Sequence, residues 1–292
     1  MSNSATTLNV AVAQTASVLG DLEANVRKHL DVIGAARSAG IDVLLFPEMS
    51  LTGHSAGSDT LRLAIDRDHR FVAQIAKAAG PMCTVFGIIE EDAAAQFYNS
   101  AIAVRNGNVA FVHRKINLAT YGKLEDGKHF AAGRHVETFT LDAKWRAGVV
   151  ICADAWNPAL VHLAAMQQAT LLMVPVSSAM EAVGAEFDNP QGWDTNLHFY
   201  ALTYGMPVMM ANRVGTEHDL TFWGGSRILD PFGRVLAVAA GRGEELVQAE
   251  LDFDAVRRAR YLLPTVRDAN LPLVRREMER VLAQGNAPPG IA

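Results

Sequence analysis

Cysteine is scarce in this chain, in which Cys83 and Cys152 are the only two among 292 residues and form no C-x-x-C pair. This scarcity excludes a disulfide-rich secreted scaffold and a cysteine-based zinc site, and it favours a reducing compartment such as the cytoplasm. Long apolar runs are also missing, and the first residues lack the charged and apolar regions of a signal peptide. We therefore expect a cytoplasmic protein without a disulfide and without a membrane partner.

An excess of basic charge is likewise absent. The formal net charge is −5 and no run of Lys or Arg occurs, so we expect no nucleic-acid partner. Half of the residues are hydrophobic and 20% are charged, a balance that excludes a disordered chain and supports a sizeable core.

Strand-like and helix-like segments alternate along the chain, with hairpin signals around 106–108 and 230–233. The apolar patterns predict strands at 9–13, 43–46, 84–89, 149–151, 171–176 and 208–211, and helices at 22–38, 61–79, 158–169 and 193–204. This alternation indicates an α/β fold in which helices cover mixed sheets. We expect one domain over 1–292, with a charged helical extension for oligomerisation from about 253 and a loose tail at 286–292.

The stretch "GVVICADAWNP" ends an apolar strand on Cys152 and then starts a helix near Pro158. Taken alone, a buried cysteine is more often a small hydrophobic residue than a nucleophile. A cysteine in a strand-to-helix turn, however, lies at the edge of a sheet, where a helix N-terminus stabilises a thiolate.

Two other strands also end on charged residues. In "LLFPEMSLTGH" Glu48 follows the apolar strand directly, and in "VHRKINL" Lys115 closes a hairpin arm. Each residue alone is more often a solvated strand end than a functional group. The loop "YGKLEDGKHFAAG" then places Glu125 downstream of Lys115, where its carboxylate could pair with the ammonium.

These motifs, in this order, resemble the nitrilase superfamily of carbon–nitrogen hydrolases. The resemblance covers nearly the whole chain, because "VAVAQT", "ANRVG" and "FWGGSRILDPFGRVLA" also match the family's pattern. It implies a four-layer α-β-β-α sandwich with Glu48, Lys115 and Cys152 as the catalytic trio. Glu125 stands where the family often carries a second glutamate, although Asp126 is adjacent.

The resemblance also suggests which residues bind substrate. We assign Ala153, Asp154, Trp156 and Ser177 to the pocket, although packing of the nucleophile turn explains Asp154 and Trp156 equally well. Ala153 is smaller than the residue that usually follows the nucleophile, which suggests extra room beside the thiol. The stretch "SSAMEAVG" after the strand at 171–176 supplies none of the aromatic residues that relatives often place near the pocket.

The trio predicts a hydrolase that cleaves a C–N bond of a small amide or N-carbamoyl amine through a cysteine thioester and releases ammonia. This chemistry needs no metal and no cofactor. The alternatives are a nitrilase that acts on a small nitrile, and a non-catalytic module for binding or assembly. A glutaminase fused to an NAD synthetase is not expected, because no second domain follows residue 292, but a subunit acting in trans stays open.

The acids Glu181, Glu186, Asp188 and Asp194 lie in a segment without Lys or Arg, which predicts an acidic pocket rim that disfavours carboxylate substrates. Solvation of a surface loop explains these acids at least as well. The apolar segments 199–214 and 258–274 predict a self-complementary surface and hence a homodimer or higher homo-oligomer.

Overall fold

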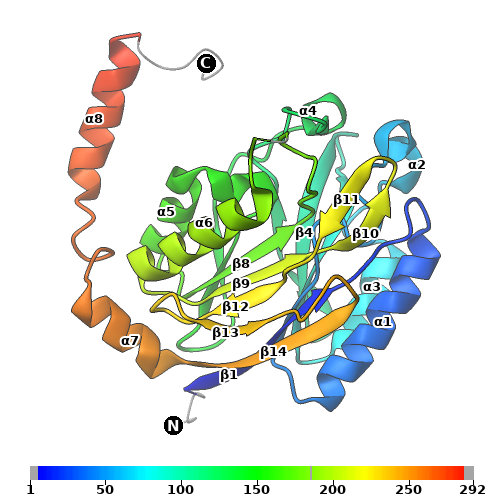
Figure 1. Ribbon diagram of the computed structural model, residues 1–292, viewed down its shortest axis with the longest axis horizontal. Coiled ribbons are helices and arrows are strands. Elements are labelled where there is room, and N and C mark those ends of the chain that lie inside the picture. The colour runs from blue at the N-terminus through cyan, green and yellow to red at the C-terminus, as the bar shows by residue number, and fades with distance from the viewer. Residues whose placement is uncertain (1–5, 185, 286–292) are drawn as a thin grey trace.

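Two six-stranded sheets lie face to face in the computed structural model, which describes residues 6–184 and 186–285 (Figure 1). The first sheet has the order β14-β1-β2-β3-β4-β5. Its strands are β1 (Thr7–Gln14), β2 (Val43–Leu45), β3 (Cys83–Glu91), β4 (Phe97–Arg105), β5 (Asn108–Arg114) and β14 (Glu245–Asp252). The second sheet has the order β13-β12-β9-β8-β7-β6. Its strands are β6 (Thr138–Thr140), β7 (Arg146–Val149), β8 (Leu171–Val176), β9 (Val208–Asn212), β12 (Arg227–Leu229) and β13 (Val235–Val238).

Helices cover the outer face of each sheet. Helices α1 (Leu22–Ser38) and α3 (Arg70–Ala79) pack on the first sheet, whereas α5 (Pro158–Met166) and α6 (Asn189–Tyr204) pack on the second. The other elements are η1 (Gly57–Asp59), α2 (Thr60–Leu63), α4 (Asp126–His129), η2 (Cys152–Trp156), β10 (Val214–Glu217), β11 (Leu220–Trp223), α7 (Phe253–Leu262) and α8 (Leu271–Ala283). The predicted four-layer α-β-β-α sandwich is therefore confirmed.

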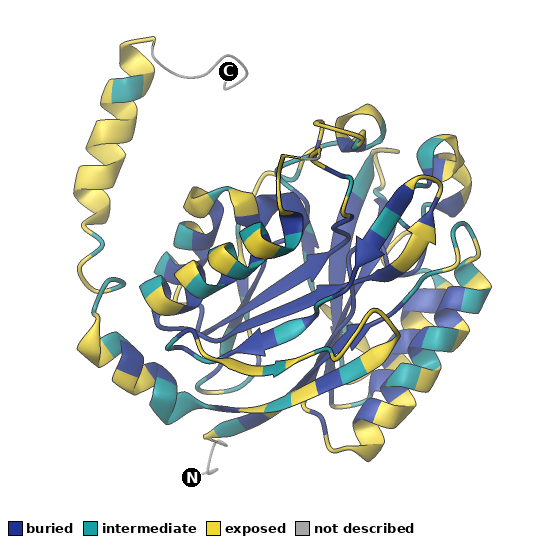
Figure 2. Ribbon diagram, in the orientation of Figure 1, coloured by how far each residue is buried: buried dark blue, intermediate teal, exposed yellow. Residues whose placement is uncertain are grey.

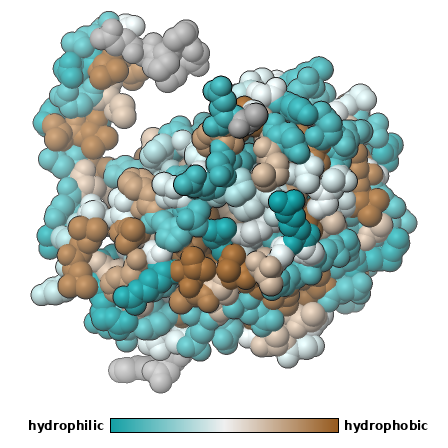
Figure 3. All heavy atoms as spheres, in the orientation of Figure 1, coloured by the Kyte–Doolittle hydropathy of each residue, from teal (hydrophilic) through white to brown (hydrophobic). Residues whose placement is uncertain are grey.

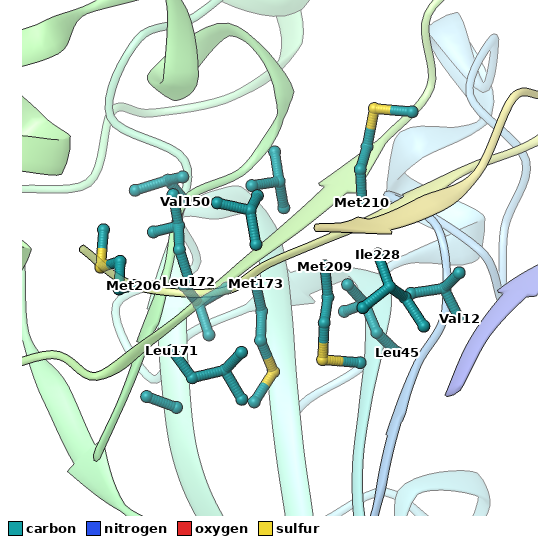
Figure 4. Packing of buried hydrophobic residues seen from close by; sticks show 14 of the residues in the cluster. Val12, Leu45, Val150, Leu171, Leu172, Met173, Met206, Met209, Met210 and Ile228 are labelled. Atoms are coloured by element: carbon teal, nitrogen blue, oxygen red, sulfur yellow. The ribbon is translucent and has the colours of Figure 1, made fainter. Parts of the chain in front are cut away.

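The alternation of side chains along a strand explains why the central strands are apolar on both faces. In β1, Val10 and Val12 face the core between the sheets, whereas Ala11 and Ala13 face α1. Figure 4 shows Val12 and Leu45 of the first sheet in the same cluster as methionines of the second. Because both faces are buried, the strand ends are where polar side chains can gather.

The predicted helix at 61–79 is wrong in its middle. The chain leaves α2 after Leu63, and Ile65 forms a β-bridge with Glu90 before His69 caps α3. The pairing joins residues 25 positions apart, so the local pattern carried no sign of it. The predicted loose tail at 286–292 lies outside the described residues. Among the described residues, every helix is too short or too polar to cross a bilayer.

Candidate active site

Glu48, Lys115 and Cys152 lie buried where strand ends of the two sheets meet, as the sequence predicted. Glu48 follows β2, Lys115 follows β5, and Cys152 begins η2 just beyond β7. The ammonium Nζ of Lys115 lies 2.7 Å from Oε1 of Glu48. Three residues distant in sequence are thus brought into one buried site.

A close backbone approach holds Glu48 in place. A Cβ at Gly87 of β3 would lie 2.1 Å from the backbone nitrogen of Met49, so no other residue fits there without a shift. Two further donors fix the carboxylate, because Asn99 Nδ2 donates to Oε1 at 2.7 Å and the backbone N–H of Ser177 donates to Oε2 at 2.8 Å. Ser177 Oγ also donates to the Glu48 carbonyl at 2.9 Å.

The predicted pairing of Glu125 with Lys115 is wrong, because the adjacent Asp126 makes the contact. Oδ2 of Asp126 lies 2.6 Å from Nζ of Lys115, and Asp126 is buried. The loop closes on itself through a hydrogen bond from Asp126 N–H to the Ala119 carbonyl at 3.0 Å, which turns Asp126 inward. Glu125 occupies the position before α4, where its side chain is 64% exposed and pairs with Lys128.

Opposite charges in this cluster stabilise one another. Burial would lower the pKa of Lys115, but the carboxylates of Asp126 and Glu48 outweigh it and hold that pKa well above its usual value. Burial would likewise raise the pKa of Asp126, but the Lys115 ammonium outweighs it and lowers that pKa. Lys115 is therefore a permanent cation at the centre of the site.

Cys152 stands at a strained turn. Its φ of 44° lies in the left-handed region, which a residue with a side chain adopts only when its surroundings enforce it. Burial raises the pKa of its thiol well above the usual value, and the Glu48 charge acts in the same direction, whereas Lys115 opposes both. The resting thiol is therefore protonated, and a nucleophilic role would require a base beside it.

Asp154, assigned above to the pocket, instead braces the turn. Its Oδ1 accepts the backbone N–H groups of Ile116 and Asn117 at 2.9 and 2.7 Å. Its Oδ2 accepts the N–H of Ile151 at 3.0 Å and lies 2.9 Å from Nε2 of His113. The side chain is fully buried and does not line the cavity beside Cys152, so the packing explanation holds.

A cavity of about 220 Å³ opens beside the Cys152 thiol. Trp156 and Ser177 line it as predicted, whereas Ala153 does not. The sequence did not point to the other lining residues, which are Tyr121, Leu124, Ser178, Ala182, Val183, Phe187, Asn189 and Trp193. The stretch after β8 lacks aromatic residues as noted, but other segments supply four aromatic rings to this cavity.

The predicted acidic rim is not built as expected, because three of the four acids serve the fold. Glu181 accepts the backbone N–H of Thr221 at 2.8 Å, Asp188 caps α6, and Asp194 pairs with Arg227. Glu186 is exposed, and none of the four lines the cavity. The alternative explanation, that these acids belong to a surface segment, fits the structure better.

Asn99 is the site residue that the sequence could have indicated. It is a buried polar residue of β4, and such a side chain in a mostly apolar strand is informative. The role of the Ser177 backbone N–H has no such signature, because any residue could supply that donor.

Comparison with known proteins identifies the family. Residues 9–261 match the carbon–nitrogen hydrolase family. The chain is 30% identical over 262 residues to a glutamine-dependent NAD(+) synthetase of Thermotoga maritima, covering 88% of this chain and 44% of that protein. It is 29% identical over 269 residues to an (R)-stereoselective amidase of Pseudomonas sp., covering 91% and 93% of the two chains. A carbon–nitrogen hydrolase from Helicobacter pylori G27 has a similar structure, with a TM-score of 0.81, 22% identity, and 91% and 96% coverage.

The chain belongs to the carbon–nitrogen hydrolase family, within the nitrilase superfamily that its motifs indicated. It spans less than half the length of the NAD(+) synthetases that it matches, 44% and 45% in two cases. It spans 93% of the amidase.

Proposed function

We propose that this protein hydrolyses the C–N bond of a small primary amide through a thioester on Cys152 and releases ammonia. One observation carries the proposal: the protonated Cys152 thiol lines a cavity, and the charges of Glu48 and Lys115 both act on its pKa. Nucleophile, base and cation are therefore close together. The similarity to an amidase, of which the chain spans 93%, supports the same chemistry. Two free thiols, Cys83 and Cys152, suit action in a reducing compartment such as the cytoplasm.

Acylation begins when Glu48 accepts the thiol proton and the Cys152 sulfur forms a bond to the amide carbon. The electron pair of the C=O bond moves to oxygen, and the Lys115 ammonium stabilises this oxyanion. One such donor is worth about 3–4 kcal/mol in other enzymes. When the oxyanion collapses, the C–N bond breaks, and Glu48 returns its proton to the departing ammonia.

In deacylation, water is the nucleophile and the Cys152 sulfur is the leaving group. Glu48 accepts a proton from water, the resulting hydroxide attacks the thioester carbon, and the C–S bond breaks. The sulfur then regains its proton from Glu48, and the product leaves as a carboxylic acid. Each cycle consumes one water and returns the enzyme unchanged, so this scheme needs no oxidant and no cofactor.

The alternatives differ in product. A carbamoyl amine gives carbon dioxide as well as ammonia, and a nitrile adds water before it can release ammonia. A non-catalytic binding module is disfavoured because Glu48, Lys115 and Cys152 are all present and buried together. We expect poor activity on nitriles.

The proposal is tested by measuring ammonia release from amide, N-carbamoyl and nitrile versions of one carbon skeleton, with carbon dioxide measured in parallel. We expect the primary amide to have the highest kcat/KM and to release no carbon dioxide. A nitrile that ranks first would overturn the proposed substrate, and a complete lack of ammonia from every compound would overturn the proposed activity.

A further inference from the structure

The cavity beside Cys152 has an aromatic wall. The ring centroids of Trp156 and Trp193 lie 5.1 Å apart, and those of Trp156 and Phe187 lie 5.6 Å apart, both pairs in edge-to-face geometry. Leu124 and Val183 add aliphatic surface. Among the described residues, no Asp, Glu, Lys or Arg lines this cavity. A substrate group that enters it therefore meets rings and aliphatic carbons, and finds no charge to pair with.

Ser177, Ser178 and Asn189, three polar residues that line the cavity, already have partners within the protein. Ser177 Oγ donates to the Glu48 carbonyl at 2.9 Å, Trp193 Nε1 donates to Ser178 Oγ at 3.1 Å, and Asn189 Nδ2 donates to the Ala179 carbonyl at 2.7 Å. Binding a charged or strongly polar group there would break these hydrogen bonds or leave the group unsatisfied, and each unsatisfied buried group costs about 1–3 kcal/mol. An apolar group incurs no such cost.

Gly192 makes room for the aromatic wall. It lies in α6, and a Cβ at this position would come within 2.9 Å of the Phe187 ring and 3.0 Å of the Trp156 ring. Because real Cβ atoms do not approach so closely, any larger residue would displace one or both rings. The lack of a side chain at position 192 therefore allows the rings of Phe187 and Trp156 to occupy their present positions.

The volume of the cavity suits one ring. In another protein an engineered apolar cavity of about 150 Å³ binds benzene. The cavity here, of about 220 Å³, has room for a ring and for the amide group that must reach the thiol.

We propose that the preferred substrate carries an uncharged aromatic acyl group, which packs on the wall formed by Trp156, Phe187 and Trp193 while its amide carbon faces Cys152. This inference rests on the proposed function for its chemistry but makes a separate claim about specificity. Amides with a free carboxylate or ammonium, such as glutamine, are poor ligands of this cavity because no described lining residue pairs with their charge.

The first experiment measures binding without turnover. Phenylacetamide, acetamide, glutamine and 4-aminobutyramide are each titrated by calorimetry into the Cys152→Ala protein. Because burial of a Phe-sized side chain contributes about 1.5–3 kcal/mol, phenylacetamide should bind about tenfold to one hundredfold more tightly than acetamide. The two charged amides should bind no better than acetamide. Tightest binding of glutamine or of 4-aminobutyramide would overturn the inference.

The second experiment moves the wall and uses a matched control. Gly192→Ala should lower kcat/KM for phenylacetamide at least tenfold and change kcat/KM for acetamide by less than about twofold. Gly34→Ala is the control, since Gly34 also lies within a helix and a Cβ there meets nothing within 4 Å. Its kinetics should match the wild type for both amides. Equal losses on both substrates in Gly192→Ala, with an unchanged thermal midpoint, would contradict the assigned wall.

The two claims fail in different ways. If phenylacetamide binds most tightly to Cys152→Ala but no amide is hydrolysed by the wild type, the aromatic site stands and the proposed function falls. If amides are hydrolysed but the charged ones have the highest kcat/KM, the proposed function stands and the aromatic specificity falls.

Discussion

In the buried cluster, one ammonium, that of Lys115, contacts the side chains of two acidic residues, Glu48 and Asp126. Lys115 Nζ lies 2.7 Å from Glu48 Oε1 and 2.6 Å from Asp126 Oδ2. Loss of the Cys152 thiol proton to bulk solvent would add a negative charge to this buried cluster, which burial disfavours strongly. Transfer of the thiol proton to Glu48 leaves the total charge of the cluster unchanged. The cluster therefore favours transfer of the thiol proton to Glu48 during attack on the substrate, rather than a stable Cys152 thiolate in the resting enzyme.

Adjacent acids provide a matched test of this cluster. Asp126→Asn should lower kcat about tenfold to one hundredfold, because a hydrogen bond between charged groups contributes about 1.5–3 kcal/mol. Glu125→Gln should stay within about twofold of the wild type, since its carboxylate is exposed and pairs with Lys128. Steady-state kinetics check both, with thermal midpoints as the control for folding. A loss in Glu125→Gln as large as that in Asp126→Asn would show that the structure identifies the wrong acid.

Asp154 is expected to act on stability. Asp154 accepts three backbone N–H groups through its two carboxylate oxygens, whereas an Asn side chain has only one oxygen. Asp154→Asn therefore leaves at least one buried donor unsatisfied. We expect the free energy of unfolding in urea to fall by about 2–4 kcal/mol, with kcat lowered because the turn that carries Cys152 loosens. If Asp154 instead bound substrate, KM would rise while stability stayed at the wild-type value.

At the scale of elements, α1 is connected to the site through one buried histidine. His29 Nδ1 donates to the Asn25 carbonyl at 2.7 Å, and Nε2 lies 2.9 Å from Ser50 Oγ. Ser50 Oγ in turn accepts the backbone N–H of Gly87 at 3.1 Å. A neutral His29 therefore ties α1 to the turn that follows Glu48 and to β3.

This link predicts a pH dependence of stability. Burial lowers the pKa of His29 from 6.5 to about 4. Below pH 6.5 the unfolded chain binds a proton that the folded chain refuses, so the stability from His29 is fully present above pH 6.5 and lost as the pH falls to about 4. A shift of this size corresponds to about 3 kcal/mol.

Urea unfolding between pH 7 and pH 4.5 measures this effect. His29→Gln should flatten the fall in unfolding free energy, whereas His135→Gln, at an exposed histidine, should follow the wild-type curve. An unchanged slope in His29→Gln would mean that other groups cause the pH dependence.

Local sequence determined some elements and not others. The helix predicted over 22–38 has the bounds of α1: the helical pattern stops at glycine, and the structure adds a cap by Asp21 at its start. The strand 171–176 likewise matches β8. By contrast, the inward turn of Asp126 and the wall of Trp156, Phe187 and Trp193 depend on contacts between distant segments. No period in the sequence encodes those contacts, so the positions of Glu48, Lys115 and Cys152 at strand ends were predictable and their surroundings were not.

At the scale of the whole molecule, α8 stands away from the body of the protein. Figures 1 and 2 show it as an exposed arm that continues from α7, and none of its residues is buried. Leu271, Val274, Met278 and Leu282 share one face at helical spacing, and hydrophobic side chains appear along this arm in Figure 3. A 13-residue helix is only marginally stable alone in water, so this apolar face needs a cover.

We propose that a second copy of the chain covers α8. Tyr261 and Leu262 of α7 extend the apolar surface within the predicted segment 258–274. The other predicted segment, 199–214, contributes less apolar surface, because Met209 and Met210 are buried in the core. Phe199 and Leu202 are among the residues that it does expose.

Light scattering tests this assembly. The wild type should have at least twice the mass of one chain at micromolar concentration, and Met278→Glu should shift it towards the single chain by placing a charge in an apolar interface. Arg276→Glu is the control, because Arg276 lies on the opposite face of α8. A single-chain mass for the wild type across this range would refute the proposal.

The most direct test of the account is ammonia release by Cys152→Ala, measured on the amide that the wild type hydrolyses fastest. Loss of a catalytic nucleophile removes several orders of magnitude from kcat in other hydrolases, so we expect less than about one thousandth of the wild-type rate at an unchanged thermal midpoint. Cys83→Ala, at the buried cysteine outside the cavity, should keep its activity. A Cys152→Ala protein that retains more than about a tenth of the wild-type rate would contradict the thioester mechanism.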